Sequence, residues 1–137
     1  MLVGNGPLFD DVARAAKPLG SRFVMLGRRD DVATLMSCAR VLVLCSRMDG
    51  TPNVLIEAQS LGVPVVSTAV GGAVDAVEDG GSGILCPANT AHALATSVEH
   101  VLRDDAMHAR MAARARIFAR ERFSLEAMLD RTQVLYH

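Results

Sequence analysis

Apolar and polar positions follow two different patterns along the chain. Short apolar runs, bounded by glycine, proline or polar residues, predict strands at 2–3, 23–26, 41–45, 63–67 and 83–86. Apolar residues three and four positions apart predict helices at 7–16, 32–39, 52–61, 73–78, 90–103, 105–122 and from 124 onward. Strands that alternate with helices indicate an α/β fold, with a doubly wound, Rossmann-like parallel sheet and C-terminal helices.

The run Val41–Cys45 is apolar at every position. This pattern is typical of a strand covered on both faces, so we expect it at the centre of the sheet. Ligands of doubly wound sheets bind beyond the carboxyl ends of the strands. The loops after Cys45 and after Ser67 are therefore the places where a site is expected.

Composition narrows the class of protein. The chain has 137 residues, half of them apolar, and a net charge of -1, which predicts one soluble globular domain over 1–137 and gives no footprint for nucleic-acid binding. Its apolar runs are too short to span a membrane, and we expect neither a signal peptide nor an anchor. Cys38, Cys45 and Cys86 lie in apolar surroundings without a C-x-x-C pair, so we interpret them as small core residues of a cytoplasmic protein with no metal site.

The segment 46–53 follows the expected central strand and leads directly into a helix. Gly50 removes a side chain where a ligand could approach closely, and Pro52 suits the start of the helix. The first helical N–H groups, at Asn53, Val54 and Leu55, would be free and would lie at the positive end of the helix dipole. A diphosphate or a sugar hydroxyl fits such a place.

Two acids lie near this helix start, and Asp49 and Glu57 are eight residues apart. Both can face one pocket, and carboxylates accept hydrogen bonds from the vicinal diols of ribose and hexose rings. The plainer interpretation is a helix cap and a solvated surface charge. Against it, Glu57 stands between Ile56 and Ala58 in a segment expected to pack on the sheet, where a carboxylate needs a polar partner.

The segment that contains these residues resembles the signature of a known family. The stretch S-R-M-D-G-T-P-N-V-L-I-E-A-Q-S-L-G-V-P-V-V-S-T-A-V-G-G is similar to the E-x7-E signature of the family-four retaining glycosyltransferases (glycosyl transferases group 1), whose GT-B fold has two facing Rossmann-like domains. Further stretches fall in the family's order and spacing, namely 4–7, 25–27, 74–80, 83–85 and 122–124. The resemblance covers nearly the whole chain and implies the C-terminal, donor-binding domain.

The resemblance implies a role for each matching residue. Glu57 would bind the ribose hydroxyls of a nucleotide, and Asp49, one methylene shorter than the commoner glutamate, would hold hydroxyls of the transferred sugar. Backbone groups would do most of the remaining work. Those beside the base would be Leu26, Gly27 and Arg28; those around the sugar and diphosphate would be Gly50, Thr51, Pro52, Asn53, Val54, Leu55, Gly71 and Gly72.

The resemblance also implies the reaction: a UDP-, GDP- or ADP-sugar donor, no further cofactor, and retaining transfer to a hydroxyl in polysaccharide or glycolipid biosynthesis, in the cytoplasm or at the inner membrane face. We expect the family's acceptor-binding N-terminal domain and first βα unit, with its basic diphosphate clamp, to be absent. The chain's histidines, His92, His100, His108 and His137, do not replace the family's catalytic histidine. The sugar or lipid-linked acceptor would be bound by the absent domain, and an uncovered sheet edge would favour self-association.

Three classes of function stay open from the sequence. The first is a glycosyltransferase donor domain that is inactive alone. The second is a non-catalytic module that binds a sugar nucleotide or serves assembly. The third is an unrelated doubly wound domain, such as a phosphate-binding regulatory module.

Overall fold

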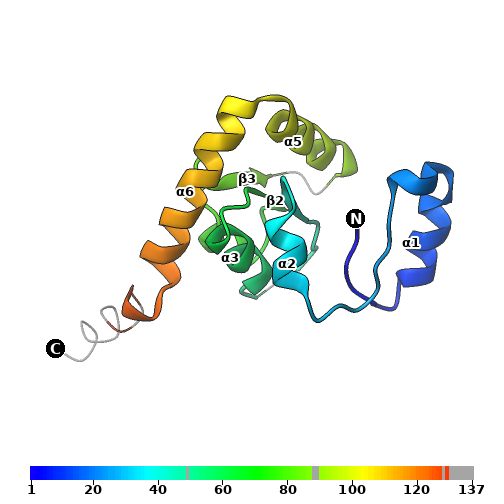
Figure 1. Ribbon diagram of the computed structural model, residues 1–137, viewed down its shortest axis with the longest axis horizontal. Helices are drawn as coiled ribbons and strands as arrows, with labels where there is room; N and C mark the ends of the chain where they lie inside the picture. Colours follow the sequence, from blue (N-terminus) through cyan, green and yellow to red (C-terminus); the bar gives the residue numbers. More distant parts are fainter. Residues whose placement is uncertain (49, 88–89, 128, 130–137) are drawn as a thin grey trace. The chain divides into compact units, whose positions relative to one another are not determined.

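The chain divides into two units, Met1–Leu35 and Met36–His137, and the division falls inside helix α2 (Val32–Ser37) of this computed structural model (Figure 1). The structure describes residues 1–48, 50–87, 90–127 and 129. The expectation of one domain over 1–137 stays a prediction.

The first unit contains helix α1 (Phe9–Ala16) and the 3-10 turn η1 (Lys17–Arg22). The two strands expected at 2–3 and 23–26 meet in a single parallel bridge between Leu2 and Met25. The N–H of Leu2 donates to the carbonyl of Val24 at 2.8 Å, and the N–H of Leu26 donates to the carbonyl of Leu2 at 2.9 Å. Where the sequence predicts two strands, the first unit therefore has one isolated parallel bridge.

The second unit is built on a parallel sheet in the order β1-β2-β3. Its strands are β1 (Leu42–Leu44), β2 (Val65–Thr68) and β3 (Gly83–Cys86). The prediction that 41–45 forms the centre was wrong for this sheet, because β2 is the middle strand and is buried throughout, whereas Val43 of β1 is 44% exposed. Both runs are apolar, and only the strand order decides which of them is enclosed.

Four helices of this unit follow the predicted positions closely. They are α3 (Asn53–Ser60), α4 (Ala73–Ala76), α5 (Ala91–Arg103) and α6 (Asp105–Phe123). The two long helices begin at side-chain caps, since Thr90 Oγ1 accepts from the N–H of Ala93 at 3.2 Å and Asp104 Oδ1 accepts from the N–H of Met107 at 2.8 Å. Helices α3 and α5 lie on opposite sides of β2 and β3 (Figure 1).

The core of the second unit joins its sheet to the C-terminal helices. Val66 of β2 and Cys86 of β3 cluster with Val101 of α5 and Met111 of α6, and all four are buried. The interpretation of the cysteines as core residues is confirmed for Cys86 only, because Cys38 and Cys45 are exposed. No helix within the described ranges is long and apolar enough to cross a membrane.

Candidate functional site

The loops after β1 and after β2 touch through their backbones. A Cβ atom placed at Gly72 would overlap the carbonyl oxygen of Gly50 and would lie 3.1 Å from the Cα of Thr51. The preceding residue, Gly71, has a φ of 50°, in the left-handed region that favours glycine. The two glycines thus let the second loop turn directly against the first.

A buried hydroxyl fixes the base of the first loop. Thr68, at the end of β2, is fully buried, and its Oγ1 donates to the carbonyl of Ser46 at 2.6 Å. Ser46 lies just beyond β1 and begins the segment that leads to Gly50. The carboxyl ends of two neighbouring parallel strands are therefore joined where the sequence predicts a site.

Helix α3 starts directly after this contact. Pro52 is buried and occupies the N-cap position, while Asn53 and Val54 lie in the first turn, where N–H groups have no acceptor within the helix. The N–H of Leu55 donates to the carbonyl of Pro52 at 3.0 Å. The expectation that all three N–H groups would be free was therefore wrong for Leu55, because the first turn tightens onto its own cap.

The side chain of Glu57 is exposed on α3. The expectation that its segment packs on the sheet is confirmed, because α3 contacts β1 and β2. The argument that the carboxylate therefore needs a polar partner was wrong, because the buried face carries Leu55, Ala58 and Gln59, and Glu57 falls outside it. The polar residue enclosed against the rest of the unit is Gln59. Exposure leaves the Glu57 carboxylate accessible to a ligand in solution.

The remaining predicted residues fall in three places. Asp49 lies outside the described residues. Leu26, Gly27 and Arg28 belong to the first unit, where Gly27 has a φ of 63° and its carbonyl accepts from the N–H of Gly4 at 2.8 Å. The rest of the predicted set lies in the second unit, and its members are Gly50, Thr51, Pro52, Asn53, Val54, Leu55, Glu57, Gly71 and Gly72.

Two residues of this region were not singled out from the sequence, namely Thr68 and Gln59. Both are buried polar residues in elements with apolar faces. A polar residue at a position where the helical or strand period calls for an apolar one was the available signal. Gln59 stands four positions after Leu55, and Thr68 ends the most enclosed strand.

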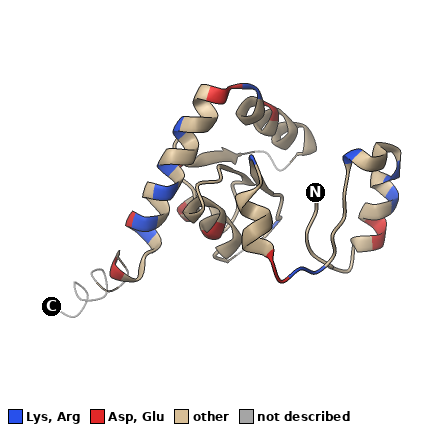
Figure 2. Ribbon diagram, in the orientation of Figure 1, with Lys and Arg blue, Asp and Glu red and all other residues tan. Residues whose placement is uncertain are grey.

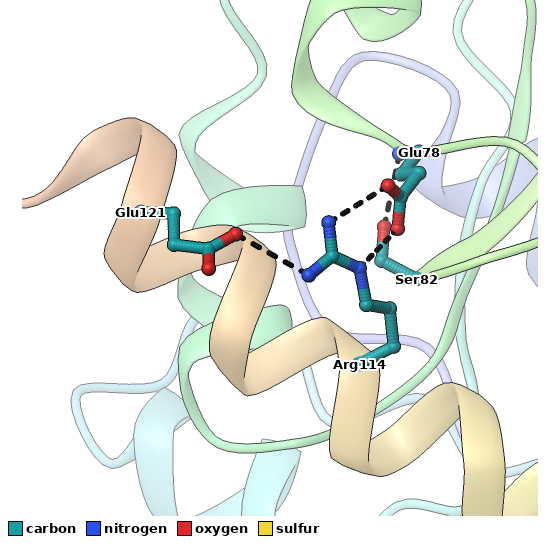
Figure 3. A network of polar contacts seen from close by, with 4 residues as sticks. All are labelled: Glu78, Ser82, Arg114 and Glu121. Atoms are coloured by element: carbon teal, nitrogen blue, oxygen red, sulfur yellow. Dashed lines mark hydrogen bonds and ion pairs between the residues drawn. The ribbon is translucent and has the colours of Figure 1, made fainter.

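Glu78, Ser82, Arg114 and Glu121 form a network of polar contacts in the second unit (Figure 3). Arg114 of α6 donates to both carboxylate oxygens of Glu78, from Nε at 2.5 Å and from a terminal nitrogen at 2.8 Å, and it also pairs with Glu121 at 3.3 Å. The hydroxyl of Ser82 accepts from the N–H of Glu78 at 3.0 Å. The hydrogen bonds from Arg114 lower the pKa of Glu78, and those to Glu78 raise the pKa of Arg114. This network fixes the turn before β3 against α6.

A smaller ion pair occupies the first unit. Arg29 donates to both carboxylate oxygens of Asp31, at 2.8 and 2.7 Å. The hydrogen bond from Arg29 lowers the pKa of the Asp31 carboxyl. The Asp31 carboxylate, just before α2, thus pairs with an arginine two residues earlier in the chain.

An open groove of about 630 Å³ runs between α3 and α6. Ile56, Ile117 and Phe123 give it apolar walls, and Arg116 and Arg120 add positive charge. These two are among the five arginines of α6, which Figure 2 shows as blue bands along the helix. The groove contains none of the predicted donor residues, so it is a separate feature.

The first-turn N–H groups of α3 can donate to an anion, and the exposed Glu57 carboxylate can accept hydrogen bonds from hydroxyl groups. Across the described ranges, no group of three or more His, Cys, Asp or Glu side chains is placed to hold a metal ion. The groups that these loops offer a ligand are the N–H donors of the first turn of α3 and the acceptor oxygens of Glu57.

Several known proteins are similar to this chain in sequence and in fold. N-acetyl-alpha-D-glucosaminyl L-malate synthase of Bacillus anthracis is 32% identical over 139 residues, which cover 100% of this chain and 36% of that protein. The crystal structure of Anabaena Alr3699/HepE in complex with UDP superposes with a TM-score of 0.86 at 27% identity, over 98% of this chain and 40% of that one. Sucrose-phosphate synthase from Thermosynechococcus elongatus also gives a TM-score of 0.86, at 29% identity, over 98% of this chain and 37% of that one.

The chain thus spans between a third and two fifths of the length of these proteins. Their agreement with the doubly wound parallel sheet confirms the predicted fold class, the C-terminal half of a GT-B fold. The sequence model of the glycosyl transferases group 1 matches residues 1–104. The family resemblance is therefore confirmed, and this chain belongs to the glycosyl transferases group 1 family.

Proposed function

We propose that this chain is the donor-binding part of a retaining glycosyltransferase and that it takes a nucleoside diphosphate sugar. The observation that carries the proposal is the backbone contact of Gly72 with Gly50 and Thr51, directly before the N-terminus of α3. Such a cradle lets phosphate or sugar oxygens approach main-chain N–H groups without interference from side chains. Relatives support it, since Anabaena Alr3699/HepE was solved with UDP and with UDP-glucose.

Each part of the proposed site has a task. The first-turn N–H groups of Asn53 and Val54 would stabilise the negative charge of the diphosphate as it departs, because the helix dipole places positive potential there. The exposed carboxylate of Glu57 would accept hydrogen bonds from the ribose hydroxyls. Asp49 would hold the transferred sugar. The role beside the base that the family resemblance implies for Leu26, Gly27 and Arg28, in the first unit, stays a prediction. No further cofactor enters the proposal.

The acceptor belongs to the same proposal. One relative, from Campylobacter jejuni, is 36% identical over 106 residues. Its name gives the acceptor as a sugar chain attached to PP-undecaprenol, which is a lipid. We infer that a sugar or lipid-linked hydroxyl acceptor is bound by residues in the part of the longer relatives that this chain does not match. By itself the chain would then bind the donor without completing transfer. We place it in the cytoplasm, and its free cysteines fit a reducing compartment.

The test is calorimetric titration of the chain with UDP, GDP and ADP, followed by the matching sugar nucleotides. Saturable binding of at least one of them is expected. Glu57→Gln removes the charge that the ribose contacts require and should weaken that binding by about tenfold or more, as for a hydrogen bond to a charged group.

The matched control is Glu99→Gln, the same change at an exposed glutamate of α5 that pairs with Arg103 at 3.5 Å. Its affinity should equal that of the wild type. Absence of saturable binding to all three nucleotides at millimolar concentration would overturn the proposal. Sugar transfer catalysed by the chain alone would contradict the statement that it cannot complete the reaction.

A further inference from the structure

Gln59 connects two helices through one buried amide. The residue is fully buried, and its Nε2 donates to the carbonyl of Leu55 at 2.9 Å and to the carbonyl of Ala76 at 2.7 Å. Leu55 is one turn earlier in α3, whereas Ala76 is the last residue of α4. Its two amide hydrogens thus join the helix that carries Glu57 to the helix that follows the Gly71–Gly72 turn.

The carbonyl of Ala76 needs such a donor. Ala76 is 1% exposed and ends a helix of four residues, so its carbonyl has no partner within α4 and little access to water. The Oε1 atom of Gln59 is buried and meets no hydrogen-bond donor among the described residues. A methionine would fill the same space without that unpaired oxygen. The reason to have an amide here is therefore the link to α4.

Helix α4 is held at both ends. At its C-terminus Ala76 accepts from Gln59, and at its N-terminus Gly72 lies against the backbone of Gly50 and Thr51. Within the helix, the N–H groups of Asp75 and Ala76 both donate to the carbonyl of Gly72, at 3.2 and 3.1 Å. A displacement at Ala76 is therefore transmitted across one helical turn to Gly72.

We infer that Gln59 is a positioning residue for nucleotide binding: it sets the distance between α3 and α4 and so keeps the Gly71–Gly72 turn against the Gly50 loop. The inference rests on the proposed function, because it assumes that these loops bind the donor. Gln59 itself touches no ligand, since it is enclosed on the inner face of α3.

The test compares Gln59→Met with the wild type by calorimetric titration of the nucleotide that the wild type binds best. Affinity should fall by about tenfold, because a displaced loop loses its alignment with the ligand. Hydrogen exchange should rise at the amides of Asp75 and Ala76 and stay unchanged along α5. The stability of the unfolding transition should change little, since the loss at Ala76 is offset by removal of the unpaired Oε1 atom.

The matched control is Ser60→Ala. Ser60 makes the same kind of bond to its own helix, from Oγ to the carbonyl of Ile56 at 2.8 Å, and has no second partner among the residues that the structure describes. Its affinity and exchange should equal the wild type. If Gln59→Met does not fold, Gln59→Asn serves instead, because the shorter amide loses its reach to Ala76 and should show the same loss of affinity.

The possible failures are distinct. Wild-type protein that binds no nucleotide would overturn the proposed function. Wild-type protein that binds, with a folded Gln59→Met or Gln59→Asn that binds equally well, would overturn only the positioning role. A purely structural role predicts a lower unfolding midpoint with unchanged affinity, which also contradicts the inference.

Discussion

Two glycines in neighbouring loops have opposite surroundings. A side chain at Gly72 would overlap the Gly50 carbonyl, although Gly72 has an ordinary φ of -71°. A Cβ at Gly50 would meet nothing within 4 Å. The requirement for glycine at position 72 is therefore steric, and it comes from the other loop.

Gly72→Ala should destabilise the protein by about 1–3 kcal/mol, the range for overpacking a close contact. Gly50→Ala is the matched control, and we expect it to change stability by less than about 0.5 kcal/mol, as for an exposed position. Urea unfolding followed by circular dichroism measures both. Equal midpoints for the two variants would show that the loops can separate freely.

At the scale of elements, α6 carries small residues on its buried side. Ala115 and Ala119 are buried on that helix, together with Met111. Small side chains allow a helix to lie close to its neighbours, and the space they leave is too small for a longer aliphatic chain. The five arginines of α6 therefore occupy the remaining faces, where two of them line the groove beside α3.

Ala115→Leu should lower the free energy of unfolding by about 1–3 kcal/mol, because Ala115 is fully buried and the added atoms must displace packed neighbours. Ala113→Leu places the same side chain two residues away on the exposed wall of the groove. It should leave the unfolding midpoint nearly unchanged. A comparable loss in both variants would indicate that helix propensity, rather than packing, governs α6.

At the scale of the whole molecule, we expect the link between Glu78 and Arg114 to contribute to stability in acid. The pKa of Glu78 in the folded state lies below its ordinary value of 4.5, chiefly through the hydrogen bonds from Arg114. A carboxylate with a lowered folded-state pKa contributes stability above the unfolded pKa. That contribution is lost as the pH falls through the lower, folded-state value.

We therefore expect the free energy of unfolding to decrease from pH 5 to pH 3, and Glu78→Gln to make this decrease smaller. The difference should be modest, because Glu78 and Arg114 keep 37% and 38% of their side-chain surface exposed and solvent screens the pair. Urea titrations at both pH values measure it, with Glu99→Gln as the control. An unchanged acid slope in Glu78→Gln would assign the acid sensitivity to other groups.

Much of this organisation could be predicted from the sequence, because it depends on local signals. Thr90 begins α5 as a cap, and Gly62, with a φ of 76°, follows the end of α3. The bounds of β3 follow from a short apolar run after glycines. Such signals act over a few residues and need no knowledge of the fold.

The errors arose where burial depends on distant parts of the chain. Val41–Cys45 and Val63–Ser67 are both apolar, and only the strand order shows that β2 is enclosed. Glu57 and Gln59 lie on the same helix, and the face that packs inward follows from the crossovers around it. The sequence marks Thr68 and Gln59 as polar residues in apolar surroundings, but their carbonyl partners, Ser46 and Ala76, follow only from the fold.

The contact between Gly72 and the Gly50 loop has a consequence for chimeras made between family members. Because the two segments meet backbone to backbone, the conformation of one sets the room available to the other. A chimera that exchanges 46–53 alone would place the loop of one relative against the Gly71–Gly72 turn of another. Under the proposed function, an exchange of donor preference between relatives would thus need 46–53 and 69–72 to be transplanted together.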